Sequence, residues 1–312
     1  MTNIVLHLSP EQCREVEAAY IENKVERNAP GVVFSAKLPD VTVTIYRTGK
    51  VMFQGAGAER EARRFGGTRQ RPGTQTSMVL KGDTLPENFS TLSVIGSDET
   101  GTGDYFGPIT VAAVFVPKDQ IGRITEMGVK DSKQLSDQAV REIAPDIIAS
   151  CAHSLLILRN EKYNALHSQG YNQGKMKALL HNQAIKHVLE KISPAEPDYI
   201  LIDQFVERET YYGYLQNEKD VIRENVLFST KAEQLHVAVA AASIIARYAF
   251  LREMDRLSSM VGLPLQKGAG LLVDEMAAKI LTRHGEETLR SISKWHFSNT
   301  EKAKKICRNM QA

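Results

Sequence analysis

Hydrophobic and polar residues alternate strictly in the stretch VTVTIYR, residues 41–47. A period of two predicts a β-strand, and here Val and Ile form one face while Thr and Tyr form the other. Thr48-Gly49 follows and leads into KVMFQG, so we expect a hairpin with its turn at these two residues. This part of the chain is therefore predicted to contain an antiparallel sheet.

A helix is predicted before this sheet, in the sequence SPEQCREVEAAYIENK. Ser9 is a suitable N-cap, Pro10 suits the first turn of a helix, and Gln12 completes a capping box. The helix and the hairpin together predict a small α+β domain in which the helix packs on the antiparallel sheet.

The predicted small domain is basic. Residues 21–82 contain 11 Lys and Arg but 5 Asp and Glu, although the whole chain has a net charge of only +2. A flat polar sheet face that carries an aromatic ring suits contact with a nucleic-acid backbone, and the alternative is an ordinary solvated sheet. The residues predicted to form this outer face are the threonines of residues 41–47, Ser35, Lys37, Tyr46 and, at the turn, Lys50.

A linker is predicted after the sheet. Residues 55–75 read GAGAEREARRFGGTRQRPGTQ, and their high content of Gly and Arg indicates a flexible basic segment with few residues that could form a core. We accordingly expect a first domain at residues 1–55, reaching about residue 85 with the linker, then the linker at 56–90 and a second domain at 91–312.

The second domain shows the pattern of a mixed α/β fold. Apolar runs predict strands in TLSVIGSDE, ITVAAVFVP, CAHSLLILRN, DYILIDQF and NVLFSTK. The stretch GKMKALLHNQAIKHVLEKI predicts an amphipathic helix, and the Ala-rich EQLHVAVAAASIIARYAFLREMDRL predicts a long helix that packs closely against the sheet.

Several protein classes do not fit the sequence. It has no stretch of the roughly 18 uninterrupted apolar residues that a membrane span needs. The N-terminus lacks the basic and apolar regions of a secretory signal, and three widely separated cysteines are typical of reduced thiols. We therefore expect a cytoplasmic monomer that does not associate with membranes.

Acidic residues follow three of the predicted strands. Asp98 and Glu99 end the first strand, Asp203 ends the run YILID, and Glu233 lies just before the Ala-rich helix. Any one of them could simply cap a turn, but four carboxylates at one edge of a sheet would repel one another unless cations bind there. Oxygen ligands select Mg²⁺ or Mn²⁺, and two such ions about 4 Å apart can catalyse phosphodiester cleavage.

The glycines after the first strand fit the same interpretation. Gly101 and Gly103, on either side of Thr102, would allow the backbone to approach a sugar-phosphate strand closely, although a tight turn is the simpler alternative. The spacing is not G-x-G-x-x-G, and no G-x-x-x-x-G-K-[ST] occurs, so we expect no nucleotide cofactor.

Several of these motifs together resemble a known family. GSDETGTGDYFGPITVAA, VKDSKQLSD, ILIDQF, STKAEQLHVAVAAASIIAR and WHFSNTEKA are similar to ribonuclease HIII, a bacterial type 2 ribonuclease H. The stretch APGVVFSAKLPDVTVTIYRTGKVMFQG is similar to the N-terminal TATA-binding-protein-like domain of that family, so the resemblance covers essentially the whole chain. It implies a ribonuclease H-like mixed sheet with flanking helices, preceded by that small α+β domain.

The resemblance also implies an activity. The chain would be an endonuclease that cuts the RNA strand of RNA/DNA hybrids with two Mg²⁺ or Mn²⁺ ions and leaves 5′-phosphate and 3′-hydroxyl ends. The glycine loop would contact the 2′-hydroxyl groups that distinguish RNA from DNA. The implied catalytic and metal-binding residues are Asp98, Glu99, Asp203 and Glu233, and the implied substrate contacts are Gly101, Thr102 and Gly103, with Lys130, Ser132 and Lys133 of KDSK.

Other functions remain open at this point. Ribonuclease HII, which acts at single embedded ribonucleotides, has a similar catalytic domain but reads GRG where this chain has GTG, and has Asp where Glu233 stands. It also lacks the N-terminal domain and carries a junction-sensing Tyr where Ala269 is found here. A non-catalytic hybrid-binding protein would not need the four acids, and a junction resolvase or transposase-like nuclease would not need the N-terminal platform.

Overall fold

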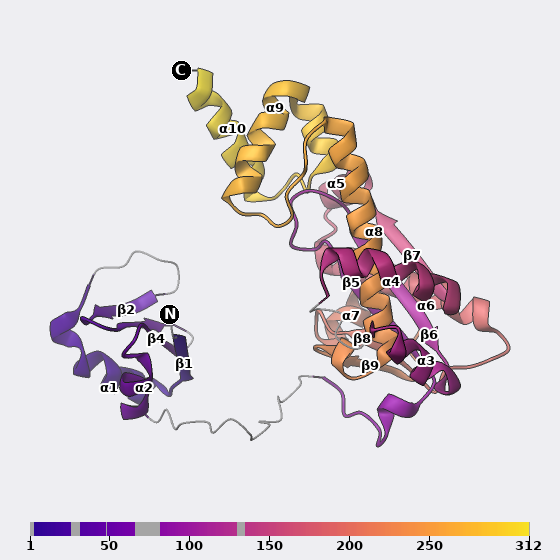
Figure 1. The fold of residues 1–312 in the computed structure, drawn as a ribbon, viewed down its shortest axis with the longest axis horizontal. Coiled ribbons are helices and arrows are strands. Elements are labelled where there is room, and N and C mark those ends of the chain that lie inside the picture. Colours follow the sequence, from indigo (N-terminus) through magenta and orange to yellow (C-terminus); the bar gives the residue numbers. More distant parts are fainter. Residues whose placement is uncertain (1–2, 26–31, 48, 66–81, 130–134, 312) are drawn as a thin grey trace. The chain divides into compact units, whose positions relative to one another are not determined.

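The structure is a computed structural model that describes residues 3–25, 32–47, 49–65, 82–129 and 135–311. The chain forms two compact units, Met1–Met78 and Val79–Ala312 (Figure 1). Each unit encloses hydrophobic side chains of its own.

The first unit is a four-stranded antiparallel sheet in the order β1-β4-β3-β2, with two α-helices on one face. Val16 of α1 and Ala62 of α2 pack on strand residues such as Val43 and Phe53. The elements are β1 (Asn3–His7), α1 (Pro10–Ala19), the 3₁₀ turn η1 (Ile21–Asn23), β2 (Val32–Lys37), β3 (Thr42–Tyr46), β4 (Lys50–Gln54) and α2 (Ala58–Arg64).

The predicted helix and hairpin are confirmed. Ser9 caps α1 and forms the reciprocal capping box with Gln12. Strands β3 and β4 pair antiparallel, and Gly49 at their turn has a φ of +76°, which favours glycine. Strand β1, which the sequence pattern did not predict, adds to the free edge of β4.

The first part of the predicted linker is wrong, because it contains α2. Ala58, Ala62 and Phe65 are spaced four and three residues apart, so they form one apolar stripe. The Phe65 ring lies 6.3 Å from Phe53 and 5.8 Å from Tyr20, measured between ring centroids. Residues 66–81 of the predicted linker lie outside the described residues. Its last part, residues 82–90, is also wrong as a flexible linker, because Asp83 pairs with Arg208 and Phe89 is buried in the core of the second unit.

The outer face of the small sheet is only partly as predicted. Lys37 and Lys50 are exposed and Tyr46 is half-buried, but Ser35 and Thr44 are buried, with 3% and 0% of their surface exposed. These two short side chains lie opposite each other on β2 and β3, and the Ser35 hydroxyl bonds the Val43 carbonyl at 3.4 Å.

The second unit is built on a five-stranded mixed sheet in the order β7-β6-β5-β8-β9, in which β5, β8 and β9 run parallel. The strands are β5 (Val94–Thr100), β6 (Ile109–Val116), β7 (His153–Leu158), β8 (Tyr199–Asp203) and β9 (Val226–Ser229). The helices are α3 (Ile121–Glu126), α4 (Asp137–Ser150), α5 (Asn160–Ser168), α6 (Gln173–Ile192), α7 (Arg208–Tyr214), α8 (Val237–Val261), α9 (Leu271–Ile292) and α10 (Ser298–Gln311), and the 3₁₀ turns are η2 (Phe89–Thr91), η3 (Lys118–Gln120) and η5 (Ala232–Gln234).

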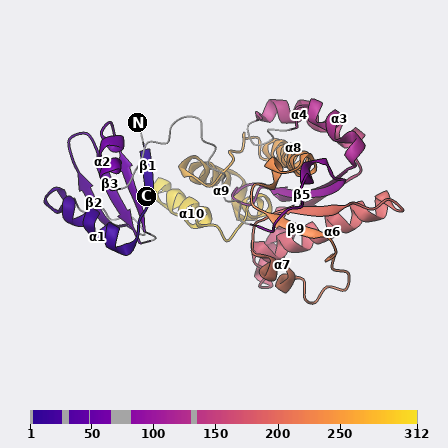
Figure 2. The same cartoon turned by 90° about the horizontal axis from the view of Figure 1, so that it is seen from below.

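Helices cover both faces of this sheet. Helices α3, α4 and α8 lie on one face, and α6 and α7 lie on the other (Figure 2). All eight residues of β6 are buried, as expected for a strand that is covered on both sides. The predicted mixed α/β class is therefore confirmed. Among the described helices, none is long and apolar enough to cross a membrane.

The long helix α8 approaches the sheet most closely at Gly96 of β5. A Cβ atom added at Gly96 would lie 2.2 Å from the backbone nitrogen of Val239 and 2.3 Å from the carbonyl carbon of Ala238. Alanines at positions 238, 240, 241 and 242 leave the helix surface small enough for this contact. Gly96 therefore fixes the distance between α8 and the strand that carries Asp98.

Beyond the sheet, α8 continues toward a C-terminal group of helices (Figure 1). Phe250 and Met254 of α8 pack there with residues of α9 and α10, and with Tyr105 and Phe106 from the loop between β5 and β6. The loop that follows the acidic residues is thus anchored in this C-terminal core.

We predict that Gly96→Ala lowers the free energy of unfolding by at least about 2 kcal/mol, because the added methyl group overlaps backbone atoms of α8. Urea unfolding followed by circular dichroism measures this change. Gly122→Ala in α3 is the matched control, since a Cβ there meets nothing within 4 Å. Equal stabilities of the two variants would contradict the close approach.

Candidate active site

The carboxyl ends of β5 and β8 meet at one edge of the mixed sheet. Ser97 pairs with Ile202 in the parallel ladder, so that Asp98 and Asp203 follow side by side. The next strand, β9, leads into turn η5, which carries Glu233. The backbone N–H of Ala232 in this turn donates to Oδ1 of Asp203 at 3.0 Å, which ties the turn to the end of β8.

A hollow of about 400 Å³ opens at this edge. Three of the four predicted carboxylates line it, whereas Glu233 is buried in η5 with 5% of its surface exposed. The lining residues are Asp98, Glu99, Thr100, Gly101, Thr102, Gly103, Asp104, Asp203, Ser243 and Arg247.

Asp98 faces α8. Its carboxylate is 4% exposed, accepts the backbone N–H of Glu99 at 2.7 Å and is hydrogen-bonded by the Ser243 hydroxyl. Burial raises the pKa of Asp98 well above its usual value, and the negative charges of Asp203 and Glu99 raise it further. Among the described residues, no cationic side chain forms an ion pair with Asp98 to offset this effect.

Glu99 points to the opposite face of the sheet, as neighbouring strand residues do. There α6 supplies Lys177, whose Nζ lies 2.6 Å from Oε1, and His181, whose Nε2 lies 3.0 Å from Oε2. Burial alone would raise the pKa of Glu99, but the hydrogen bond with His181 and the charge of Lys177 lower it below its usual value. Glu99 is thus held ionised by an internal cation.

The chemistry of these groups fits a hard divalent cation. All the donor atoms are carboxylate oxygens, and positive charge would relieve the repulsion that raises the pKa of Asp98. Within the described residues, no three Asp, Glu, His or Cys side chains already surround a common point as metal ligands do. Side-chain rearrangement, above all of Glu99 away from Lys177, would accompany metal binding.

The glycine loop forms one wall of the hollow. Gly101 has a φ of +93°, and a Cβ there would lie 2.2 Å from the Pro108 carbonyl, so glycine is needed for conformation and packing. Gly103 is exposed, and a Cβ there would meet nothing within 4 Å. The backbone is therefore open to a ligand at Gly103 rather than at Gly101.

The other predicted substrate contacts in this unit, Lys130, Ser132 and Lys133, lie outside the described residues. Sequence reasoning did not predict the contacts of Lys177 and His181 with Glu99, nor that of Gln173, whose Nε2 donates to the Thr102 carbonyl at 3.1 Å. A signal was present, because Lys177 and His181 are four residues apart on the buried face of an amphipathic helix.

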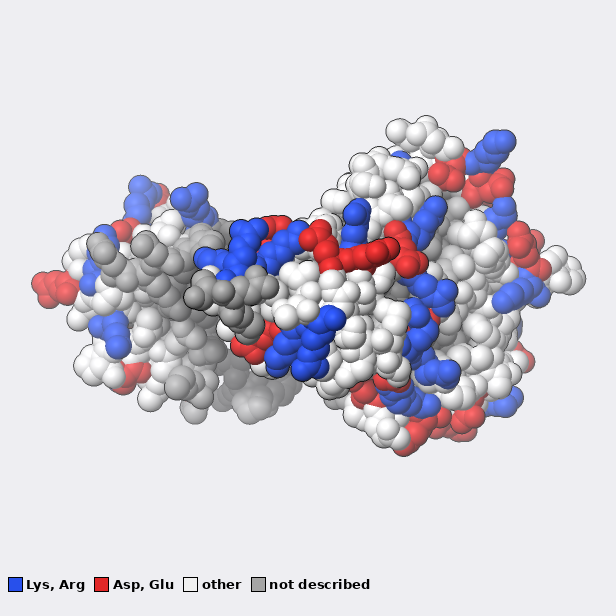
Figure 3. Space-filling model, turned by 90° about the horizontal axis from the view of Figure 1, so that it is seen from above, with Lys and Arg blue, Asp and Glu red and all other residues white. Residues whose placement is uncertain are grey.

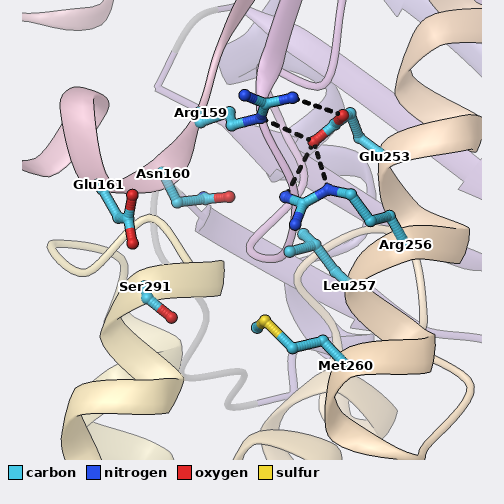
Figure 4. Close-up of a pocket in the computed structure, with 8 residues that line it drawn as sticks. All are labelled: Arg159, Asn160, Glu161, Glu253, Arg256, Leu257, Met260 and Ser291. Carbon is cyan, nitrogen blue, oxygen red and sulfur yellow. Dashed lines mark hydrogen bonds and ion pairs between the residues drawn. The ribbon is translucent and has the colours of Figure 1, made fainter.

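A second cavity, of about 320 Å³, shares no lining residue with the hollow (Figure 4). Arg159 and Arg256 dominate it, and both guanidinium groups bind the carboxylate of Glu253 at 3.0–3.2 Å. This arrangement is a structural ion-pair cluster, so the hollow at the strand ends is the stronger candidate for an active site.

Comparison with known proteins gives the family. Residues 95–300 match the family described as Ribonuclease HII, and residues 3–78 match a domain of unknown function, DUF3378. The chain is 61% identical to ribonuclease HIII of Lysinibacillus sphaericus, over 98% of this chain and 100% of that protein. It is 50% identical to ribonuclease HIII of Bacillus pumilus, over 98% and 99% of the two chains.

Solved structures point to the same family as the sequence relatives. The crystal structure of Bst-RNase HIII in complex with Mn²⁺ has 46% sequence identity and a TM-score of 0.70, covering 99% of this chain and 100% of that one. Aquifex aeolicus RNase H3 has 22% identity and a TM-score of 0.55 over 95% of this chain, and shares the fold. The chain therefore belongs to the ribonuclease HIII family, whose members are endonucleases that cleave the RNA strand of RNA/DNA hybrids.

Proposed function

We propose that the hollow at the ends of β5 and β8 is the site of this cleavage, with Asp98, Glu99, Asp203 and Glu233 as the ligands of Mg²⁺ or Mn²⁺. The observation that carries the proposal is Asp98, a buried carboxylate whose pKa is raised by burial and by the charges of Asp203 and Glu99. Such an arrangement is unfavourable in an ordinary turn, and a bound cation would make it favourable.

Bound divalent ions supply an activated water and stabilise the charge on the leaving oxygen, which gives 5′-phosphate and 3′-hydroxyl products. The residues of the chain position the reacting groups. Ser243 and the backbone N–H of Glu99 orient the Asp98 carboxylate, and Ala232 orients that of Asp203. Lys177 and His181 keep Glu99 ionised before metal binds.

Recognition of RNA is proposed for Gly101, Thr102 and Gly103. The exposed backbone at Gly103 lies in the wall of the hollow that contains Asp98, so a ribose whose phosphate reaches the carboxylates would also reach this loop. Backbone N–H and C=O groups can bond a 2′-hydroxyl, which is both a donor and an acceptor.

Ala269 favours runs of RNA over single embedded ribonucleotides as the substrate. It is exposed next to Gly268, whose N–H bonds the Asp104 side chain of the glycine loop at 2.5 Å. A methyl group at this place can neither stack on a sugar nor hydrogen-bond one. We therefore propose that several consecutive 2′-hydroxyl groups are needed for recognition.

The face of the first unit's sheet opposite α1 and α2 is proposed to bind the hybrid duplex. Lys37, Tyr46 and Lys50 all lie on this face, because Ala36, Ile45 and Val51 beside them point into the core. On the face of the molecule drawn in Figure 3, Lys and Arg side chains lie among acidic ones. The proposal therefore rests on the position of Lys37, Tyr46 and Lys50 on one sheet face rather than on overall charge.

We further propose that the enzyme works in the cytoplasm. Cys13, Cys151 and Cys307 are free cysteines, as is usual in a reducing compartment. Burial raises the pKa of the Cys151 thiol to about 11, which keeps it protonated and unreactive. The monomeric state stays a prediction from the sequence.

We predict that Asp98→Asn lowers cleavage of a labelled RNA/DNA hybrid in saturating Mg²⁺ by more than about a hundredfold. A metal ligand should matter at least as much as the outer partners of ligands, whose loss costs about 10–100-fold. Hybrid binding, measured by fluorescence anisotropy, should change by less than about twofold, because the substitution keeps the shape of the site. The exposed Asp119→Asn serves as the control, and near wild-type cleavage by Asp98→Asn would refute the assignment.

We predict that Mn²⁺ binding weakens as pH falls. Below its raised pKa Asp98 carries a proton, which a cation must displace, so the dissociation constant should rise by up to about tenfold per pH unit as the pH falls below that pKa. Calorimetry in two buffers of different ionisation enthalpy measures the released proton. Asp98→Asn should bind weakly without this proton release, and pH-independent binding by the wild type would contradict the role of Asp98.

We predict that the double variant Lys37→Ala/Lys50→Ala binds hybrid more weakly and with less salt dependence. Two lost phosphate contacts reduce the slope of log K against log salt by up to about 1.8. Arg14→Ala/Arg63→Ala removes the same charge from the helices on the other face. If both pairs change the slope equally, net charge and not the sheet face is responsible.

A further inference from the structure

The loop that follows the glycines is fastened to the C-terminal helices by main-chain hydrogen bonds. The Tyr105 N–H donates to the Gly268 carbonyl at 2.9 Å, and the Gly107 N–H donates to the Ile292 carbonyl at 3.0 Å. In return, the backbone N–H of Lys294 donates to the Tyr105 carbonyl at 2.8 Å. The loop is therefore paired with two segments that lie more than 160 residues further along the chain.

The Lys294 side chain lies inside this contact and is fully buried. Its Nζ donates to the carbonyl of Asp104 at 2.8 Å and to the carbonyl of Gly107 at 2.7 Å. Asn160, which begins α5, donates to the same Gly107 carbonyl at 2.8 Å and is labelled in Figure 4. The Tyr163 ring lies 5.8 Å from the ammonium.

A buried ammonium is costly for the fold. Burial lowers the pKa of Lys294 to about 7, and the charge of Asp104 only partly opposes this. The site has room for an unbranched side chain, so an apolar residue such as methionine would avoid the desolvation cost. What lysine adds is the pair of hydrogen bonds from its Nζ to the loop carbonyls.

One of these carbonyls belongs to Asp104, the residue that closes the glycine turn. The Asp104 N–H donates to the Gly101 carbonyl at 3.3 Å and so closes the turn Gly101-Thr102-Gly103. The Asp104 side chain accepts the Gly268 N–H at 2.5 Å, and its carbonyl accepts Lys294. Asp104 is thus held by three hydrogen bonds, and one of them comes from the Lys294 side chain.

We propose that Lys294 is a positioning residue that sets the glycine turn for reading RNA, without touching the substrate itself. The inference rests on the proposed role of that turn in contacting 2′-hydroxyl groups. Removing the ammonium frees the Asp104 carbonyl, which allows the turn to shift and weakens its match to the ribose.

The test compares wild type with Lys294→Met on a duplex that contains a run of four ribonucleotides. In four further duplexes, each ribonucleotide in turn is replaced by its 2′-deoxy counterpart. We expect kcat/KM of Lys294→Met on the intact run to fall about 10- to 100-fold, the cost of a small misplacement. The largest loss caused by a deoxy substitution should also shrink by at least about tenfold relative to wild type.

The outcomes separate the possible explanations. A merely structural role lowers kcat/KM on all five duplexes equally and leaves the deoxy profile unchanged, which would overturn the inference. If no deoxy substitution affects the wild type, the proposed reading by the glycine turn fails instead. Lys279→Met, an exposed lysine of α9, is the control and should match wild type.

A second variant keeps the test decisive if thermal melts show that Lys294→Met does not fold. Asn160→Ala removes the other donor to the Gly107 carbonyl and leaves the ammonium in place. It should flatten the deoxy profile in the same direction but by a smaller factor. An unchanged profile in Asn160→Ala would then overturn the inference.

Discussion

Mutual repulsion between carboxylates at the end of a buried sheet is the constraint around which the second unit is organised. The repulsion is offset in different ways on the two faces of β5. On the α6 side, Glu99 is neutralised by Lys177 and bonded by His181. On the α8 side, Asp98 accepts hydrogen bonds but forms no ion pair with any described residue, and its pKa is raised. The negative charge that is not neutralised is therefore that of Asp98, and a divalent ion bound beside this carboxylate would neutralise it.

The elements packed around β5 keep these carboxylates close together. Gly96 brings the backbone of α8 against β5 only two residues before Asp98. Strand β6, buried along its whole length, supports β5 from the other edge. The C-terminal helices then hold the loop that begins at Gly101. Two of the four proposed metal ligands, Asp98 and Glu99, thus belong with the glycine loop to one continuous strand-and-loop segment that is fixed from three sides.

Sequence patterns predicted the features that depend on nearby residues. The cap at Ser9, the β3–β4 hairpin, the alanine-rich α8 and the acids at the strand ends all follow from local periodicity. Helix α2 was missed because its apolar stripe is embedded among Gly and Arg, whose abundance suggested a linker.

The contacts of Glu99 with Lys177 and His181 were missed for another reason. They join residues 78 and 82 positions apart, and nothing local specifies which strand α6 will cover. The same holds for Lys294 and the glycine loop, 187 or more positions apart. Such pairs arise only when the helices pack, so a single sequence records the residue types but not their partners.

The ion pair between Lys177 and Glu99 has a consequence for how the protein folds. Because a lysine already occupies the place of a counter-ion, the acidic strand can enter the core while the nascent chain is still free of divalent cations. Burial of the Glu99 charge therefore does not depend on Mg²⁺ or Mn²⁺.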